Sequence, residues 1–544
     1  MIVKKQDQRS RSGAAAVLGP MFLLSFLLSP APRAQAQQFD APFLSLEANN
    51  RQRWEREDQQ VDRKLAALES RFGKKPNIIY ILADDVGWGE LGSYLGGKLM
   101  GRPSETLDQM AAGGMKFLSH YAEPSCTPTR LAILTGRHPV RTGVNTVLWP
   151  GGPEHLGLHP EELTVAEVLS DAGYHTAMWG KWHVGDAEMH APENQGFDFA
   201  HYGLFNGAVW FWLDVEGHYK DREIVTGAHP FHDFPGVDEY AERFGIDIAG
   251  GYYVGRKGRG RERGKDLTSS KDMEDFEETS IDEITGFIRD KATSDRPFFI
   301  YWATYFHQDA SSPQKYRLQD GVDFVNNQAA QAGQHDEHMR RLLQTLRDEG
   351  IEENTLVVWV SDNGPMDYFW PNGGYTWLRG HKGDVLEGGV RTPAIAHWPG
   401  MIEAGQDPID MIHVVDLFTT AARLAGVKDR LPTDRIIDGI DQTALLVLGE
   451  GHGRRDYIFH YSGSQLGAVR MGNFKLLFKG PEKGGIPQAD LFNIMRDPRE
   501  EHAHESTGSM LAYNIPFQYL IRSHLEMKRQ FPDRVLAPPP SSER

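Results

Sequence analysis

The stretch Asn77-Ile78-Ile79-Tyr80-Ile81-Leu82-Ala83-Asp84-Asp85 decides the fold. Its first seven residues form a near-continuous apolar run, which is the pattern of a central strand buried on both faces of a sheet. The run ends in two adjacent carboxylates, which repel each other unless a cation lies between them. Asp84 and Asp85 therefore predict a hard divalent metal ion at the end of this strand. The alternative is that the pair only caps the turn at Gly87.

Three further apolar runs alternate with helical patterns along the chain. The first, His175–Trp179, leads to Lys181 and His183; the others, 297–303 and 356–360, lead to His307 and to Asp362 with Asn363. Helices are predicted at 106–112, 165–171, 279–291, 335–349 and 414–425, the second opened by a capping box of Thr164 and Glu167. The alternation predicts an α/β fold with helices on both faces of a sheet and functional groups at the carboxyl ends of its strands. By itself a Lys-x-His pair is more often solvated than catalytic.

The single cysteine of the 544 residues lies in Cys126-Thr127-Pro128-Thr129-Arg130. Pro128 suits the first turn of a helix, so Cys126 is expected at a helix N-terminus. Free amide groups and the helix dipole at that end favour anions and are expected to lower the pKa of the thiol. Arg130, one turn along, adds a planar positive group for sulfate, phosphate or carboxylate. The alternative is a small buried cysteine that caps a core helix.

The first 36 residues have the pattern of a secretory signal peptide. Basic residues precede the apolar run 14–28, and Ala34-Gln35-Ala36 provides a small-residue cleavage site. A membrane anchor is disfavoured because the run is short and contains Gly19 and Pro20. We therefore expect a periplasmic or secreted protein with no membrane span after cleavage.

Charge and cysteine content narrow the class further. Removal of residues 1–36 takes away five positive charges and one negative charge, which moves the formal net charge from −17 to −21. A protein this acidic is a poor candidate for nonspecific nucleic-acid binding. One cysteine allows no intramolecular disulfide, although the expected compartment permits disulfides. A lone thiol kept in an exported protein favours a functional role for Cys126.

Composition divides the remaining chain into segments. Residues 37–75 are a polar N-terminal extension with a helical pattern at 51–71, and residues 76–428 carry the α/β pattern. Within the latter, residues about 201–266 are predicted to be a surface insertion that ends in a basic run, whose role in guiding anionic substrates stays open. Residues 429–454 are predicted to be a linker, residues 455–530 a small α+β subdomain with an antiparallel sheet, and residues 531–544 a tail.

The strand ends together predict a cation site beside an oxyanion pocket. Three carboxylates and one amide oxygen form a ligand set for a hard cation, and calcium fits best because neither histidine nor thiolate is needed: Asp84, Asp85, Asp362 and Asn363. The basic groups expected around it suit a tetrahedral oxyanion: Arg130, Lys181, His183, His307 and Lys382.

The cysteine motif, followed by Thr135-Gly136, resembles the signature of the sulfatase family. Further stretches resemble that family's landmarks in the same order: 77–85, 180–183, 360–364, and Lys382 with 387–391. The resemblance covers roughly residues 75–505. It implies an alkaline-phosphatase-like mixed sheet flanked by helices on both faces, with a smaller C-terminal antiparallel-sheet domain. It also implies a bound calcium ion and the oxidation of Cys126 to formylglycine by a separate maturase.

The resemblance further implies a role for each residue of the site. Asp84, Asp85, Asp362, Asn363 and the modified Cys126 would hold the metal. The hydrated aldehyde would attack sulfur with help from Asp362, and His183 would be the base for the elimination of sulfate. Arg130 and Lys181 would hold the hydrate and the sulfate oxygens, while Lys382 and His307 would protonate or stabilise the leaving alkoxide.

Two positions depart from the family pattern. Family members usually place the acid histidine one residue further and often follow it with proline, whereas His307 precedes Gln308-Asp309. His381 stands where a small residue is common before the lysine.

The sequence thus predicts an exported sulfuric ester hydrolase for aryl or carbohydrate sulfates. One alternative is a phosphonate or phosphodiester hydrolase that uses the same formylglycine. The other is a catalytically silent protein that binds sulfated glycans through the same pocket. The particular ester, the maturase and the oligomeric state stay open.

Overall fold

A computed structural model describes residues 39–149, 156–205, 251–267, 270–306, 326–366, 374–483, 486–504 and 507–535. The predicted signal peptide, His307, most of the predicted insertion and the end of the predicted tail lie outside these ranges. Within them, the structure contains no helix with the length and apolar character that a membrane span requires.

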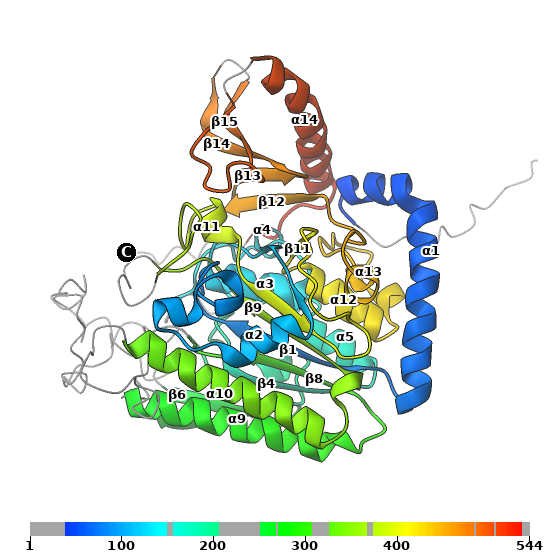
Figure 1. Cartoon of the computed structure of the whole chain (residues 1–544), viewed down its shortest axis with the longest axis vertical. Coiled ribbons are helices and arrows are strands. Elements are labelled where there is room, and N and C mark those ends of the chain that lie inside the picture. Colours follow the sequence, from blue (N-terminus) through cyan, green and yellow to red (C-terminus); the bar gives the residue numbers. More distant parts are fainter. Residues whose placement is uncertain are drawn as a thin grey trace, which may run out of the picture. The chain divides into compact units, whose positions relative to one another are not determined.

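A nine-stranded mixed sheet forms the centre of the structure (Figure 1), with the order β2-β10-β9-β1-β8-β4-β5-β6-β7. Five neighbouring strands run parallel: β9 (Thr355–Ser361), β1 (Asn77–Ala83), β8 (Phe298–Ala303), β4 (His175–Lys181) and β5 (Phe199–Gly203). Antiparallel strands complete both edges: β10 (Ala394–His397), β2 (Met115–Lys116), β6 (Gly251–Arg256) and β7 (Gly260–Asp266). Because the five central strands are parallel, their carboxyl ends share one edge of the sheet.

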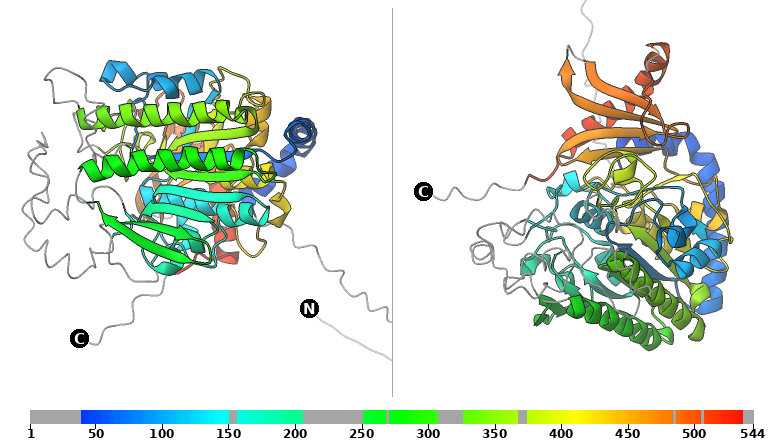
Figure 2. Two further views of the ribbon diagram at one scale, coloured as in Figure 1. Left: turned by 90° about the horizontal axis from the view of Figure 1, so that it is seen from below. Right: turned by 60° about the vertical axis from the view of Figure 1, so that its left-hand side comes forward.

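Side chains of β1 alternate between two apolar layers. Ile79, Ile81 and Ala83 pack with α2 (Glu105–Ala112), α9 (Ser270–Ala292) and α10 (Asn326–Asp348). Ile78, Tyr80 and Leu82 pack on the other face with α3 (Cys126–Thr135), α5 (Val165–Asp171) and α12 (Asp416–Leu424). Figure 2 shows α9 and α10 side by side along one face of the sheet. The strand buried on both faces that the apolar run predicts is confirmed, and the capping box at Thr164 is present.

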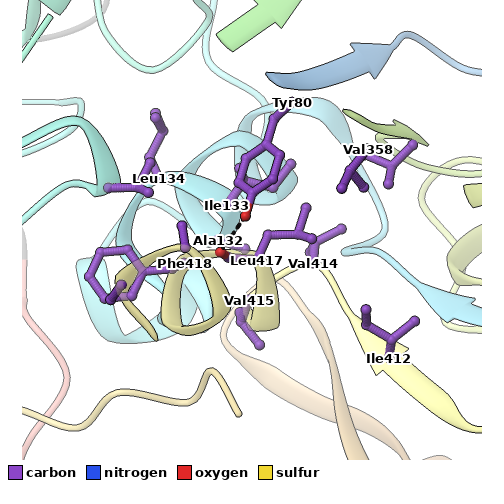
Figure 3. Packing of buried hydrophobic residues seen from close by; sticks show 14 of the residues in the cluster. Tyr80, Ala132, Ile133, Leu134, Val358, Ile412, Val414, Val415, Leu417 and Phe418 are labelled. Atoms are coloured by element: carbon purple, nitrogen blue, oxygen red, sulfur yellow. Dashed lines mark hydrogen bonds between the residues drawn. The ribbon is translucent and has the colours of Figure 1, made fainter. Parts of the chain in front are cut away.

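The helix that begins at Cys126 is held from behind by this core. Figure 3 shows Ala132, Ile133 and Leu134 of α3 against the residues of α12. Tyr80 of β1 reaches the same contact, and its hydroxyl donates a hydrogen bond of 2.8 Å to the backbone oxygen of Leu417. Strand β1 and helix α3 are therefore fixed relative to each other.

A separate four-stranded antiparallel sheet lies towards the C-terminus, as the predicted fold class requires. Its strands follow the chain order: β12 (Tyr457–Ser462), β13 (Gln465–Met471), β14 (Phe474–Lys483) and β15 (Ile486–Asn493). Helix α14 (Thr507–Gln530) follows it, and Phe517 and Leu520 of this helix join the core that contains Phe459 and Val469. A short two-stranded sheet pairs β3 (Ser119–Tyr121) with β11 (Met411–His413).

Three segments are packed more closely than their composition predicts. Helix α1 (Ala41–Phe72) begins ten residues before the helical pattern and buries Trp54 and Val61, because its apolar residues recur at helical spacing. The predicted linker buries Ile436 and Ile437 and contains α13 (Thr443–Leu448). The basic run of the predicted insertion forms the β6–β7 hairpin, which extends the main sheet. Among the described residues, the other α-helices are α4 (Pro139–Thr142) and α11 (Glu387–Val390), and several short 3-10 helices lie in the connections.

Candidate active site

Asp84 and Asp85 follow the central strand β1 directly and are fully buried. Asp85 has a left-handed backbone, with φ of 61°, which few residues other than glycine adopt without support. Its amide donates a hydrogen bond of 3.0 Å to Oδ1 of Asp362. The turn therefore holds both carboxylates at the edge of the sheet.

The end of β9 brings Asp362 and Asn363 to the same place. The amide of Asp362 donates a hydrogen bond of 3.1 Å to the oxygen of Ala83, which aligns the two strand ends. Nδ2 of Asn363 donates one of 2.6 Å to Oδ1 of Asp85. Oδ1 of Asn363 is buried and has no hydrogen-bond partner among the described residues. An unpaired acceptor beside three carboxylates suits a cation ligand.

Cys126 is the first residue of α3, as Pro128 predicts. Its Sγ lies 3.5 Å from Oδ1 of Asp84 and 3.9 Å from Oδ1 of Asp85. Burial, together with the nearby Asp362 and Asp84, raises the pKa of the thiol above its usual value. The expected lowering of the pKa by the helix N-terminus is thus wrong, because desolvation and carboxylate charge outweigh the dipole. An unmodified Cys126 is a neutral thiol here and a weak nucleophile.

Three cations surround the carboxylates. Nζ of Lys181 lies 2.6 Å from Oδ2 of Asp84, and Nζ of Lys382 lies 2.7 Å from Oδ1 of Asp85. Arg130 lies 3.3 Å from Oδ2 of Asp362 through its terminal nitrogen. The side chains of Arg130 and Lys181 are fully buried. The site therefore combines a negative centre with positive groups placed to hold an anion.

The carboxylates respond differently to this setting. Burial alone would raise the pKa of Asp84, but the charges of Lys181, Arg130 and Lys382 outweigh it and lower that pKa. Burial and the neighbouring charges of Asp84 and Asp85 raise the pKa of Asp362 to about 7. Without a metal ion, Asp362 therefore ionises at a higher pH than Asp84.

His183 lies just past the end of β4, where a backbone φ of 58° turns the chain. The strand ends at Lys181, so the alternation that would place Lys181 and His183 on one face does not extend to the histidine. Nε2 of His183 lies 2.9 Å from the oxygen of Leu148. Burial, with the charges of Lys181 and Arg130, moves the pKa of His183 well below its usual value, so the ring is neutral.

The residues present fit a calcium ion. Ligand-type atoms of Asp84, Asp85, Cys126 and Asp362 all lie within 4.8 Å of one another, and all four residues are buried. Asn363 contacts this group through Nδ2, 2.6 Å from Oδ1 of Asp85, and its unpaired Oδ1 is a candidate for a further oxygen ligand. Hard cations prefer oxygen, so the sulfur of Cys126 is the one mismatched member, and an oxygen at that position would complete the set.

Sequence reasoning missed the hydroxyl groups inside the cysteine motif. Thr127 contacts the backbone of His183, and Thr129 donates a hydrogen bond of 2.5 Å to the backbone oxygen of Asp362. Because both partners are backbone oxygens of distant segments, no sequence pattern marks them. The one hint in the sequence is that Thr127 and Thr129 place two hydroxyl groups within a single helical turn.

The sequence analysis also does not identify a second group of potential metal ligands. Glu123, His138 and His413, here called the Glu123 cluster, are buried with ligand-type atoms within 4.8 Å of one another. Nδ1 of His138 lies 2.9 Å from Oε1 of Glu123. Glu123 lies only three residues before Cys126, so the two clusters flank the start of α3.

The Sulfatase family matches residues 76–427. The chain belongs to the sulfatase family. This sulfatase is 34% identical over 426 residues to N-acetylgalactosamine-6-sulfatase of Canis lupus familiaris, a match that covers 74% of the chain and 72% of the relative. It is also 34% identical over 425 residues to human arylsulfatase A, with coverages of 74% and 75%.

A solved structure agrees with this assignment. The crystal structure of the PsFucS1 sulfatase from Pseudoalteromonas sp. matches with a TM-score of 0.79 and 31% identity, over 88% of this chain and 95% of that chain. The predicted family, the α/β fold and the class of enzyme are thereby confirmed. This sulfatase hydrolyses sulfuric esters.

Proposed function

We propose that this sulfatase is exported, binds one calcium ion and cleaves aryl or carbohydrate sulfates with a formylglycine derived from Cys126. The observation that carries the proposal is the position of Sγ of Cys126, 3.5 Å from Asp84 and within the carboxylate cluster. A neutral thiol there has little reactivity, whereas the hydrated aldehyde supplies an oxygen nucleophile that suits a hard cation.

The chain's own residues provide the remaining chemistry. Asp84, Asp85, Asp362 and Asn363 would hold the calcium ion through oxygen atoms. Lys181 and Arg130, both fully buried, hold the sulfate oxygens and stabilise the charge that develops on them. Asp362, a buried carboxylate in the same cluster as Cys126, accepts a proton from the nucleophile.

Three further residues act on the leaving oxygen and in the release of sulfate: His183, Lys382 and His307. His183 is neutral and accepts a proton during sulfate release. Burial would lower the pKa of Lys382, but Asp85, Cys126 and Asp84 raise it well above the usual value, so its ammonium group is present to stabilise the leaving oxygen. His307 keeps its predicted role as the acid for the leaving group, and it lies outside the described residues.

A pocket of about 270 Å³ lies beside Cys126 and Lys382, and its volume supports a substrate with a single ring at the active site. It is lined by Ser125 and Pro128 beside Cys126, by Lys382, and by Tyr461 and Ser462 of the small sheet. Its volume lies just below the range of about 300–1,000 Å³ found for drug-sized ligands. Relatives whose names specify a hexosamine sulfate and an aryl sulfate agree with one ring at this place.

Export supplies the setting for this chemistry. The signal-peptide pattern of residues 1–36 directs the chain to the periplasm or the outside, and a separate maturase oxidises Cys126.

Mass spectrometry of the peptide that spans Cys126, from protein purified out of its native host, tests the proposal. We expect a mass lower than that of the cysteine peptide, as an aldehyde requires. The same preparation should release an aryl alcohol from an aryl sulfate much faster than from an aryl phosphodiester. An unmodified thiol in active protein would refute the formylglycine, and faster phosphodiester cleavage would favour the phosphonate or phosphodiester alternative. Modified protein that turns over no sulfate ester would leave a sulfated-glycan-binding protein.

A further inference from the structure

Thr127 connects two segments that meet at the active site. Its hydroxyl donates a hydrogen bond of 2.9 Å to the backbone oxygen of His183 and accepts one of 3.2 Å from the amide of Leu148. The side chain is fully buried, so no water competes for these bonds. One hydroxyl in the cysteine motif thus sets the distance between the turn after β4 and the segment around Leu148.

The same two segments determine the protonation of His183. Nε2 of His183 lies 2.9 Å from the backbone oxygen of Leu148. A carbonyl oxygen can only accept a hydrogen bond, so Nε2 carries the proton of the neutral ring. The lone pair is then on Nδ1, which is buried and unpaired among the described residues. The backbone at Leu148 therefore selects one tautomer of the histidine.

Backbone strain makes this arrangement dependent on its supports. His183 has a φ of 58°, a left-handed conformation that is strained for a residue with a side chain. Such a residue stays in place only when several contacts fix it. The amide of His183 donates to the oxygen of Leu204 at 3.0 Å, and Thr127 holds the carbonyl on the other side.

We propose that Thr127 is a positioning residue, which fixes the His183 turn and Leu148 so that Nδ1 of His183 is the atom that accepts the proton. The inference rests on the proposed role of His183 as a base. It adds the ring nitrogen that acts and the residue that selects it. Thr127 itself touches neither substrate nor metal in this scheme.

The chain offers a matched control in the same helix. Thr135 is also buried in α3, but its hydroxyl bonds only to the oxygen of Leu131, at 2.7 Å, within its own helix. Thr135→Val therefore removes a buried hydroxyl from α3 without touching His183. Thr127→Val removes the link to His183 and Leu148, and Thr127→Ser keeps it.

The first measurement is the fraction of aldehyde at position 126 in each variant, by mass spectrometry, because Thr127 lies inside the motif that is modified. Kinetics are then expressed per aldehyde-containing molecule. We expect Thr127→Val to lower kcat by about 10–100-fold with little change in KM, as for residues that orient a catalytic group. Thr127→Ser and Thr135→Val should keep the kcat of the parent enzyme. An equal kcat for Thr127→Val and Thr135→Val would overturn the inference.

The second measurement needs no turnover. Ring ¹⁵N spectra of histidine-labelled protein, with His183 assigned from the spectrum of His183→Asn, report the tautomer directly. We expect the Nε2-protonated form in the parent protein and in Thr127→Ser, and a changed tautomer balance in Thr127→Val. A proton on Nδ1 in the parent protein overturns the inference even if Thr127→Val does not fold. A parent protein without sulfate-ester turnover instead refutes the proposed function, and the spectra still decide the tautomer.

Discussion

The active-site cluster and the Glu123 cluster lie at either side of the start of α3, and both consist of buried side chains of the kinds that bind metals. In the active site, three carboxylates meet within 4.8 Å of Cys126. In the Glu123 cluster, one carboxylate meets two histidines. Residue type alone would allow a metal ion at either place.

Charge balance separates the two clusters. At Asp362, burial and the charges of Asp84 and Asp85 raise the pKa, so the active site holds more negative charge than its cations relieve locally. At His138, burial would lower the pKa, but Asp438 and Glu123 outweigh it and raise that pKa. Burial also raises the pKa of Glu123. Nδ1 of His138 and Oε1 of Glu123 lie 2.9 Å apart, so the two groups can share one proton and the Glu123 cluster balances its own charge.

The comparison shows what marks a metal site in a structure without ions. Three carboxylates in contact raise the pKa of Asp362 even though each of them pairs with a lysine or arginine, and Asn363 keeps an unpaired buried oxygen, so this cluster favours an added cation. A carboxylate already paired with a histidine does not. We therefore expect calcium at the active-site cluster and a stabilising role for the charges around Glu123.

The largest effect should come from Cys126→Ala. Loss of the atom that becomes the nucleophile should lower kcat for an aryl sulfate by at least about 10⁴-fold, the scale found when a nucleophile is removed. Thermal unfolding should change little, because one small buried side chain replaces another. Thr135→Val is the control with an intact motif, and residual activity in Cys126→Ala above the background of the assay would contradict the mechanism.

Next in size is the effect of Asp438→Asn on stability. Asp438 accepts hydrogen bonds from Nε of Arg141 at 2.8 Å and from the amide of His138 at 2.8 Å. Breaking a buried ion pair from one side costs about 3–5 kcal/mol, and Arg141 would keep only Asp40, at 3.2 Å, as a counter-ion. Urea unfolding should show this loss, with calcium affinity unchanged.

An exposed pair provides the matched control. Asp434 pairs with Arg435 at 2.9 Å, but its side chain is largely solvent-exposed. Asp434→Asn should change the free energy of unfolding by less than about 1 kcal/mol. Equal losses in Asp434→Asn and Asp438→Asn would mean that the ion pairs near Glu123 do not hold the fold together.

Asp362→Asn should have effects opposite to those of Asp438→Asn: weaker calcium binding and a more stable calcium-free protein. Removing one of three carboxylate ligands should weaken calcium binding by more than about 100-fold, since about 100-fold is the upper end for residues that only orient a metal ligand. The same change relieves repulsion, so the calcium-free variant should be more stable than the calcium-free parent. Calcium titration calorimetry and unfolding in chelator measure the two effects. A variant with parental affinity would place the ion elsewhere.

The sequence predicts the active-site cluster but not the Glu123 cluster. Apolar runs that end in carboxylates predict strands and a shared edge, which is why Asp84, Asp85, Asp362 and Asn363 were found together. The Glu123 cluster draws its members from a loop, a helix start and β11, and none of these carries a periodic pattern. Its assembly depends on tertiary packing, which a single sequence does not display.

The segment predicted to be a linker is packed more closely than its composition suggests, for a related reason. Its polar composition, Asp429 to Asp441, resembles an exposed connection, yet Asp438 is buried against Arg141 and the neighbouring isoleucines enter the core. Composition describes a segment by itself, whereas a buried ion pair depends on a partner almost 300 residues away. The lowered thiol pKa expected for Cys126 failed in the same way, because the helix end was considered without the carboxylates beside it.

The smallest predicted effect is a pH dependence of the calcium-free protein. Asp362 has a folded-state pKa of about 7 against an ordinary value of 3.8. A raised carboxyl pKa contributes stability below the unfolded-state pKa, and that contribution is lost as the pH rises through the folded-state value. Between pH 6 and pH 8 in chelator, the free energy of unfolding should therefore fall by about 1 kcal/mol from this group, as one pKa unit is about 1.4 kcal/mol.

Histidines also titrate in this range, so the decisive quantity is a difference between variants. The fall between pH 6 and pH 8 should be smaller by about 1 kcal/mol in Asp362→Asn than in the parent, both in chelator. In saturating calcium the parent should lose the same part of the slope, because a bound cation keeps Asp362 ionised at both pH values. An identical slope in parent and variant would show that the repulsion among the three carboxylates is already relieved without a metal. Charge balance would then no longer distinguish the active-site cluster from the Glu123 cluster.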